Sequence, residues 1–467
     1  MAGESSARGP GSLYTRAVEG FDGVPGGRVA GLKTTGLKHA ANFARFVLFG
    51  LANVNCGGPA SPSPATAQAS PTATPNPNGF LYAQAADGYW GFKIGPTGQL
   101  TPVANGAISA LQPSFSPDGS KAAFWDGQSL AVRTVNADGT FSASAAQLNL
   151  TGVLRNTPGN FGYWLVWNKT GSVVVIAGGS GNRGTTQSPN AYAGEIVAVA
   201  YADGRLGILP PGVLPMGVSC EAPLFTADDS LYVKHFGLYR GPGGDVRQYS
   251  VAGGSLTAGP VIPISIDTGG NDYEAFLTSD EKFLVAGDIS YGSMTTTFRP
   301  IGRMTLAPFL TQADLLGSLS VQGRFALLMA WRNRDQALMT YQVRDDGAFT
   351  AVSPPTSIGL DDFAYFAAQK GQVVVFFNPA SGQVKTVPVS FNGQLGAVKG
   401  SSWFLPRASY PSLSLSTNVT GAYIYAFSES APAAAWVDVN GDVATFDPFP
   451  GGTSFRRVTK TAVVYKP

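Results

Sequence analysis

Apolar and polar residues alternate along much of this chain in short runs, which is the period expected of half-buried β-strands. Residues 129–135 (Ser-Leu-Ala-Val-Arg-Thr-Val) and 338–343 (Leu-Met-Thr-Tyr-Gln-Val) follow this pattern. Other runs, such as 172–177 and 372–377, are strongly apolar and suit a strand that packs against neighbours on both faces. The pattern therefore predicts an all-β protein made of many short strands.

The turns between these runs recur at a regular distance. Eight of them end in glycine, followed by any residue and then an apolar one, and Asp-Gly or Asn-Gly turns can adopt the positive φ angles that a tight hairpin needs. The 343 residues from the first glycine to the last make seven intervals with a mean of 49 residues. The glycines are Gly98, Gly139, Gly204, Gly254, Gly302, Gly347, Gly393 and Gly441.

A second series of turns lies between the first, at residues 116–119, 168–171, 227–230, 279–282, 321–323, 369–371 and 418–421. Two hairpins per repeat make four strands, and a recurring four-stranded unit is the blade of a β-propeller. We predict eight blades over residues 79–467, with seven as the alternative. Residues 455–465 match the first half of a repeat and 80–103 the second half, so we expect the two ends to pair and close the ring.

Composition and the scarce reactive residues narrow the function classes. Only 13% of residues are charged and the formal net charge is +2, with no basic stripe, so no nucleic-acid partner is expected. Cys56 and Cys220 show no zinc-site spacing. Of two histidines, His39 lies outside the repeats, and His235 ends an apolar strand and is interpreted as a hydrogen-bonded or surface histidine without a catalytic role. The sequence predicts no catalytic, cofactor-binding or metal residue.

Two local motifs favour loops over binding sites. The turn at 438–442 places Asp438, Asn440 and Asp442 at alternate positions, as a calcium loop does, but Phe449 stands where the bidentate glutamate should be. We interpret it as a hairpin turn. Residues 178–184 are rich in glycine but lack the Lys and Ser/Thr of a phosphate loop, which favours an extended hairpin loop or a contact loop.

The repeat unit resembles a known family. The strand-turn-strand segments 341–352, 92–103 and 249–257 are similar to repeats of the lactonase-type (6-phosphogluconolactonase-like) β-propellers, and the turn at 116–119 is also similar to TolB-like propellers. The resemblance covers most of residues 79–467. Its members usually have seven blades, whereas eight turn units occur here. No catalytic acid, histidine or arginine of that family matches a position in this chain, so the resemblance carries over no active-site residue.

A cluster of charged residues in the central channel would distinguish an enzyme from a scaffold. Convergent Arg, Asp and Glu side chains there would favour an enzyme, and a channel filled by apolar strands would favour a structural role. The residues whose position would decide this are Arg240, Arg247, Glu274 and Arg324.

The segment before the propeller differs in composition from the repeats. Residues 56–78 hold six prolines among Ala, Ser and Thr, which predicts an extended linker. Residues 1–55 form a separate N-terminal arm, and the apolar spacing in 37–54 predicts a short amphipathic helix. Such a helix needs a partner, which is either a membrane or another protein.

The arm leads to a hypothesis of function. The chain keeps Met1, which an exported and processed protein would lose. Ordering the arm and the linker would cost about 1–2 kcal/mol per residue, and contacts along neighbouring subunits would offset that cost. We therefore predict a non-enzymatic bacteriophage virion protein without cofactor or membrane contact. Its arm would bind other virion proteins, and its propeller would serve decoration or attachment to a host-surface glycan or protein.

The alternative is an exported bacterial protein. In it, residues 46–52 are the apolar part of an export signal, Cys56 is the lipidated first residue, and 57–78 is the spacer. The propeller would then be either an envelope binding protein or a lactonase-like enzyme.

Overall fold

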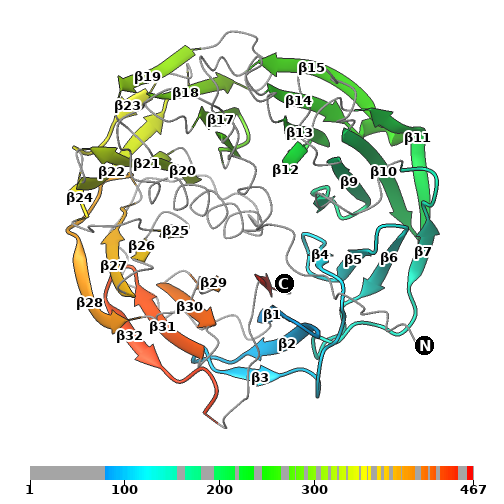
Figure 1. The fold of residues 1–467 in the computed structure, drawn as a ribbon, viewed down its shortest axis with the longest axis horizontal. Coiled ribbons are helices and arrows are strands. Elements are labelled where there is room, and N and C mark those ends of the chain that lie inside the picture. The colour runs from blue at the N-terminus through cyan, green and yellow to red at the C-terminus, as the bar shows by residue number, and fades with distance from the viewer. Residues whose placement is uncertain are drawn as a thin grey trace, which may run out of the picture. The chain divides into compact units, whose positions relative to one another are not determined.

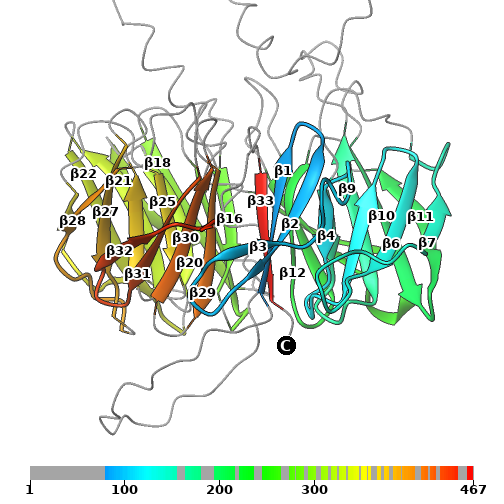
Figure 2. The same cartoon turned by 90° about the horizontal axis from the view of Figure 1, so that it is seen from below.

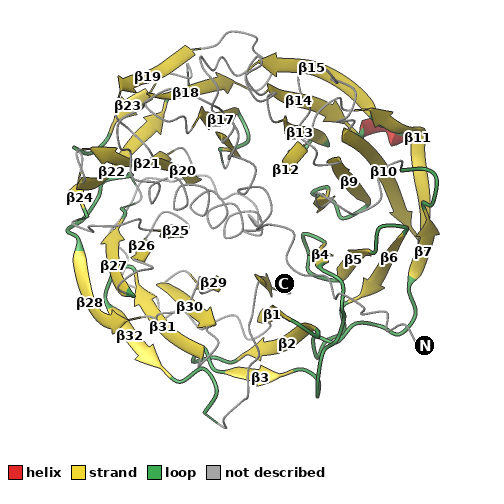
Figure 3. Ribbon diagram, viewed as in Figure 1, coloured by secondary structure: helices red, strands yellow, loops and turns green. Residues whose placement is uncertain are grey.

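The structure, a computed structural model, describes residues 79–465 with gaps at the connections between strands, the longest being 155–163, 180–193, 236–244, 264–272, 405–411 and 451–459. The predicted arm (1–55) and linker (56–78) lie outside the described residues. The described part is all-β, as predicted, and holds one 3-10 turn at Ala252–Gly254 (Figure 3). In these residues no helix is long and apolar enough to span a membrane.

The strands form antiparallel sheets of four neighbouring strands each, one of which carries a fifth. The first sheet joins the two ends of the described chain, in the order β3 (Leu100–Pro102), β2 (Gly88–Ile94), β1 (Gly79–Ala85) and β33 (Lys460–Tyr465). The next is β4 (Pro113–Phe115), β5 (Lys121–Trp125), β6 (Ser129–Thr134) and β7 (Ala146–Asn149). It is followed by β8 (Trp164–Trp167), β9 (Val173–Gly179), β10 (Gly194–Ala202) and β11 (Arg205–Pro215).

The remaining sheets repeat this order. They are β12 (Cys220–Phe225), β13 (Ser230–His235), β14 (Asp245–Ser250) and β15 (Thr257–Pro263), then β16 (Tyr273–Leu277), β17 (Phe283–Asp288), β18 (Ser293–Pro300) and β19 (Ala307–Ala313). Next come β20 (Gly317–Gln322), β21 (Phe325–Arg332), β22 (Asp335–Val343) and β23 (Phe349–Ala351), with β24 (Thr356–Ser357) also paired to β22. The last two are β25 (Tyr365–Gln369), β26 (Val373–Phe377), β27 (Gln383–Pro388) and β28 (Lys399–Phe404), and β29 (Ser412–Asn418), β30 (Gly421–Phe427), β31 (Pro432–Asp438) and β32 (Val443–Phe446).

The sheets follow one another around a common centre in a propeller-like arrangement, each with one strand at the centre and its fourth at the rim (Figure 1). The inner strands contact each other in chain order, from β4 through β8, β12, β16, β20, β25 and β29 to β33. This agrees with the predicted repeat of four-stranded units.

The two ends of the described chain pair with each other. β33 lies antiparallel to β1, with Tyr82 opposite Ala462 (Figure 2). The sequence predicted that the last segment would supply half of a repeat, but in the described residues it supplies one strand, β33, and the N-terminal side supplies the other three.

The glycine turns have the conformation that the sequence predicts. All of them join the third and fourth strands of a sheet, and six have positive φ, from 73° at Gly204 to 88° at Gly98, whereas Gly302 and Gly347 lie outside the described residues. In the turns between first and second strands, glycine is replaced twice by an acid with positive φ, at Asp229 (62°) and Glu281 (56°).

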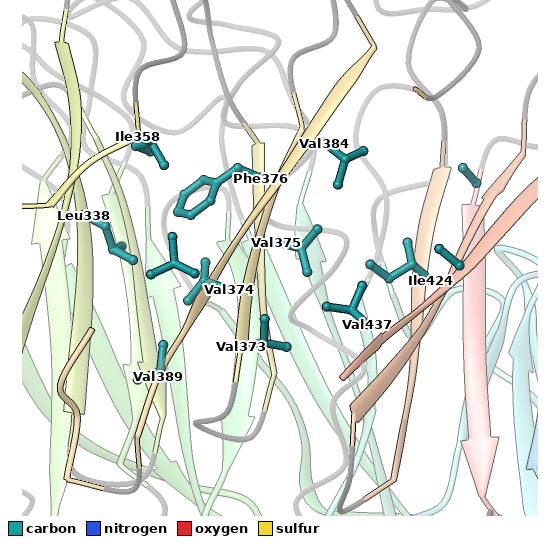
Figure 4. Packing of buried hydrophobic residues seen from close by; sticks show 13 residues of the cluster. Leu338, Ile358, Val373, Val374, Val375, Phe376, Val384, Val389, Ile424 and Val437 are labelled. Carbon is teal, nitrogen blue, oxygen red and sulfur yellow. The ribbon is translucent and has the colours of Figure 1, made fainter. Parts of the chain in front are cut away.

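The core consists of apolar clusters between neighbouring sheets. Strand β26 is apolar at every position, so it can bury both faces. Val373 to Phe376 are at most 5% exposed, and they form one cluster with residues of the two adjacent sheets, including Leu338 and Ile424 (Figure 4). Burial of each such side chain stabilises the fold by about 1.5–3 kcal/mol.

Candidate functional site

The alternating strand direction gives the sheets two distinct ends. The turns between first and second strands and those between third and fourth strands share one end, which we call the turn end. The connections between second and third strands, and those leading to the next sheet, share the opposite connection end. The two ends carry different chemistry.

At the turn end, glycine turns are held by hydroxyl groups of the preceding sheet. Four such hydrogen bonds are described: Tyr82 Oη to Gly139 O (2.7 Å), Thr340 Oγ1 to Gly393 O (2.7 Å), Thr386 Oγ1 to Gly441 O, and Tyr425 Oη to Gly98 O (2.7 Å). Burial raises the pKa of the Tyr82 hydroxyl well above its usual value, and the nearby Asp138 adds to this, so the group remains a donor. The repeated turn is therefore also the contact between sheets.

The acids of the inner turns bind their own turns. Thr226 Oγ1 donates to Asp228 Oδ1 at 2.5 Å, and the backbone N–H of Ser230 donates to the same oxygen. These hydrogen bonds, that of Thr226 first, hold the pKa of Asp228 below its usual value although burial opposes the shift. At Asp118, burial raises the pKa, but hydrogen bonds from Ser116 and Ser120 bring it below the usual value. A carboxylate of lowered pKa is a poor general base at neutral pH.

The two acids with positive φ in the turns between first and second strands link neighbouring turns. Asp229 Oδ1 accepts a hydrogen bond from Asn168 Nδ2 at 2.9 Å, and Asn168 is fully buried. Glu281 accepts from the backbone N–H of Ala227 at 2.6 Å and forms an ion pair with Lys169 at 3.5 Å. The left-handed conformation costs a non-glycine residue about 1–2 kcal/mol, which these contacts offset. The described polar groups of these turns thus stabilise the ring.

The turn with calcium-loop spacing is also bound internally. Asp438 Oδ1 accepts hydrogen bonds from the backbone N–H groups of Asn440 and Asp442, and Asp442 forms an ion pair with Lys399 at 2.6 Å. Phe449 is buried. These carboxylates serve the hairpin and the neighbouring sheet, as the hairpin interpretation predicts. Across the described residues, no group of three or more His, Cys, Asp or Glu is arranged to hold a metal ion.

Charge on the inner strands is confined to the connection end. Within the bounds of the described inner strands, the charged residues are Glu221, Glu274 and Lys460, each the first or second residue of its strand. Because every inner strand runs from the connection end to the turn end, all three lie at the connection end. β12 and β16, which carry the two glutamates, contact each other.

A row of three reactive residue types crosses the sheet β12–β15 at the same end. Cys220 is the register partner of His235, and His235 is the partner of Asp245. The sequence interpretation of His235 as a hydrogen-bonded or surface histidine did not include this row. The three residues are separated along the chain, and their alignment depends on a register shift between Glu221 and Leu224, for which the sequence has no clear signal.

Of the four charged residues that the sequence analysis singled out, two lie in described strands. Arg247 lies in β14 opposite Val233 and is half-buried, and Glu274 lies in β16 opposite Gly287. Arg240 and Arg324 lie outside the described residues. Of the four, the structure therefore brings Glu274 to the connection end of an inner strand and places Arg247 on a third strand.

The comparisons with known proteins concern structure alone. No family model matches the chain, and no curated protein sequence matches it. A dihydro-heme d1 dehydrogenase, NirN, in complex with DHE is similar with a TM-score of 0.51 at 10% identity, over 85% of this chain and 77% of that one. At this identity the likeness shows the fold.

Two further solved structures are similar with lower scores. The periplasmic gluconolactonase PpgL of Pseudomonas aeruginosa has a TM-score of 0.44 and 16% identity, over 69% of this chain and 94% of that one. A candidate 6-phosphogluconolactonase of Bacteroides uniformis has a TM-score of 0.46 and 13% identity, over 83% and 99%. Both bear names of the lactonase type that the repeat unit resembles.

The hypothesis of a non-enzymatic bacteriophage protein is wrong by this comparison. The similar structures bear the names of lactonases and other enzymes, which fits the exported lactonase-like alternative better than a virion component. The error came from the N-terminal arm. Its composition was interpreted as that of a segment with a partner, and an export signal followed by a spacer fits the same composition as well as a virion arm does.

Proposed function

We propose that this protein is an exported enzyme of the bacterial cell envelope that hydrolyses a lactone at the connection end of an eight-bladed β-propeller. Each sheet is one blade, and the pairing of β1 with β33 closes the ring. The site lies at the inner mouth, where β12 and β16 begin.

The observation that carries the proposal is the one-sided charge of the inner strands. Glu221 and Glu274 occupy the second positions of adjacent inner strands, and no inner strand has a charged residue within its bounds nearer the turn end in the described residues. A carboxylate at such a mouth can act as general base toward a water molecule that attacks an ester carbonyl. At the turn end, the carboxylates of Asp228 and Asp438 accept hydrogen bonds from their own turns, and those of Asp229 and Glu281 accept hydrogen bonds from neighbouring turns.

The lactone is proposed from the repeat units, which resemble those of the lactonase-type propellers. A lactone is a small neutral ester, so it needs hydrogen-bonding groups and a base and does not need a large charged surface. This suits a chain with 13% charged residues and a formal net charge of +2. Function nevertheless depends on the site and not on the fold, so the activity requires a direct test.

The envelope location is proposed from the N-terminal segment. Cys56 precedes a linker of Pro, Ala, Ser and Thr, the composition of a spacer between a lipidated cysteine and a folded domain. Incorporation of radiolabelled palmitate into the protein expressed in a bacterial host, and its loss in Cys56→Ser, would support this location. Equal labelling of the two proteins would contradict it.

Hydrolysis of gluconolactone by the full chain tests the enzyme. We expect Glu221→Gln and Glu274→Gln to lower kcat/KM at least about 100-fold if either carboxylate is the base, in line with general base catalysis. Asp203→Asn is the matched control, since Asp203 is an exposed acid at the turn end, and it should retain full activity.

The same variants distinguish an enzyme from an envelope binding protein. Binding of gluconolactone by calorimetry without turnover, weakened by Glu221→Gln and not by Asp203→Asn, would replace the enzyme by a binding protein with the same site. Equal loss of activity in all three variants would contradict a site at the connection end.

A further inference from the structure

We propose that Cys220, His235 and Asp245 form a second reactive group, in which Cys220 is a thiol nucleophile, His235 its base and Asp245 the residue that orients the histidine. The inference rests on the proposed function for the class of substrate, an ester or lactone carbonyl. It assigns a second, covalent route through a thioester, distinct from the direct attack of water that Glu221 or Glu274 would assist.

The strand register carries this inference. Cys220 stands directly opposite His235 on β13, and His235 stands directly opposite Asp245 on β14. Residues directly opposite in antiparallel strands share one face of the sheet, with Cβ atoms about 4.5–5.5 Å apart. The histidine is therefore the middle residue of the row, as a base between a nucleophile and an orienting carboxylate requires.

The order of the row suits a relay. Neighbouring strands lie about 4.8 Å apart, so Cys220 and Asp245 are separated by two strand spacings, about 10 Å, with His235 between them. A relay requires the nucleophile next to the base and the base next to the carboxylate, and the row has this order.

The row lies on the face of the sheet that packs against the preceding sheet. Alternation along β13 puts His235 on the same face as Leu231 and Val233, which are fully buried against residues of β9 and β10. Along β13, His235 is two residues beyond Val233 in the direction of the connection end. Arg247, the register partner of Val233, places a cation on that face two residues from Asp245.

The pairing of β12 with β13 is irregular next to this row. The register shifts between Glu221 and Leu224 in β12, whereas the other described pairings of a first with a second strand keep one register. Such bulges are over-represented next to active sites, where they change the aim of a side chain. Without the shift in β12, Cys220 would not stand opposite His235.

The chemical step balances with water as the only co-reactant. His235 takes the proton from the Cys220 thiol, and the sulfur attacks the lactone carbonyl carbon to form a C–S bond. The ring C–O bond breaks, and the leaving alkoxide takes the proton from the imidazolium. Water, deprotonated by His235, then attacks the thioester, which releases the hydroxy acid and restores the thiol.

The test measures the reactivity of Cys220 when it is the only thiol in the protein. In a Cys56→Ser background, the full chain is alkylated with iodoacetamide between pH 5 and 9. Because a paired histidine stabilises the thiolate, we expect Cys220 to react at least about 10-fold faster at pH 6 than it does in His235→Asn, whose profile should follow an ordinary thiol near pH 8.5. Asp245→Asn should give an intermediate profile.

Lys234→Gln is the matched control, because Lys234 is the neighbour of His235 on the opposite face of β13. It should leave the alkylation profile unchanged. Thermal unfolding of each variant checks that the fold is intact. If His235→Asn lowers the melting temperature, His235→Gln and Asp245→Ala are compared in its place. Identical profiles in the parent and in folded His235 variants would overturn the proposal.

The outcomes separate this inference from the proposed function. Fast, His235-dependent alkylation without hydrolysis of gluconolactone would support the thiol group and contradict the lactonase. Hydrolysis that needs Glu221 or Glu274 and is unchanged in Cys220→Ser would support the lactonase and overturn the thiol route.

Discussion

The turn end and the connection end of the sheets are built by the same repeat but use their polar residues differently. At the turn end, hydroxyl groups, amides and carboxylates bind the turns of their own and adjacent sheets, as in the bonds from Tyr82 to Gly139 and from Asn168 to Asp229. The charged residues of the described inner strands lie at the connection end. The difference teaches that regular repetition stabilises a ring, and that departures from it mark where function is to be sought.

The largest loss of stability is expected from a substitution at a turn-end glycine that has no room for a side chain. A Cβ atom on Gly139 (φ 87°) would lie 2.5 Å from two ring atoms of Phe80, whereas on Gly204 (φ 73°) it would meet nothing within 4 Å. Both substitutions to alanine carry the backbone cost, and Gly139→Ala adds overpacking of about 1–3 kcal/mol. Chemical denaturation should show this difference, and equal losses of stability would contradict the packing described.

A smaller loss of stability is expected when the hydroxyl group that donates to the Gly139 carbonyl is removed. Tyr82→Phe leaves the Gly139 carbonyl without its described side-chain partner, which should cost about 1–3 kcal/mol. Tyr232→Phe is the control, because the Tyr232 hydroxyl is buried without a hydrogen-bond partner in the described part of the chain. Burial, with the negative charge of Asp228, raises its pKa to about 12.

Removing the buried Tyr232 hydroxyl should leave the free energy of unfolding unchanged or raise it slightly. Urea unfolding of both variants measures the difference. A loss in Tyr232→Phe as large as that in Tyr82→Phe would contradict the special role of the hydroxyls that bind glycine turns.

The smallest effect concerns pH. The folded pKa of Asp228 lies below its unfolded value, so the carboxylate stabilises the fold above the unfolded pKa, near 4, and this contribution is lost as the pH falls through the folded pKa. Asp228→Asn should therefore lower stability at pH 7 and make it less dependent on pH below 4. Melting temperatures at pH 7 and 3 check this, and parallel curves for the two proteins would refute it.

Much of the fold could be predicted from the sequence because turn chemistry is local. Positive φ at the glycine of a tight turn is decided within four residues, so the positions of Gly98 and Gly441 indicated hairpins directly. The apolar run at 372–377 likewise indicated a strand with both faces buried. The single strand contributed by the C-terminal end was not predicted. Residues 455–465 were interpreted as half a repeat, whereas the described pairing there is that of one strand, β33, with β1.

The candidate site was much less predictable. Alignment of Cys220, His235 and Asp245 depends on pairing between strands and on one extra residue in β12, and neither leaves a periodic signal in the sequence. The sequence did identify Glu274 and Arg247 as residues whose position matters. Only the order of strands in the sheets assigned Glu274 to an inner strand and Arg247 to a third strand.

We propose that residues at the connection end provide the activity and that residues at the turn end stabilise the fold. Gluconolactone hydrolysis and melting temperature, measured in the same preparations of Glu221→Gln and Tyr82→Phe, test this division. We expect Glu221→Gln to lose turnover with an unchanged melting temperature, and Tyr82→Phe to melt at a lower temperature but keep its turnover while folded. Turnover lost in folded Tyr82→Phe and retained in Glu221→Gln would contradict it.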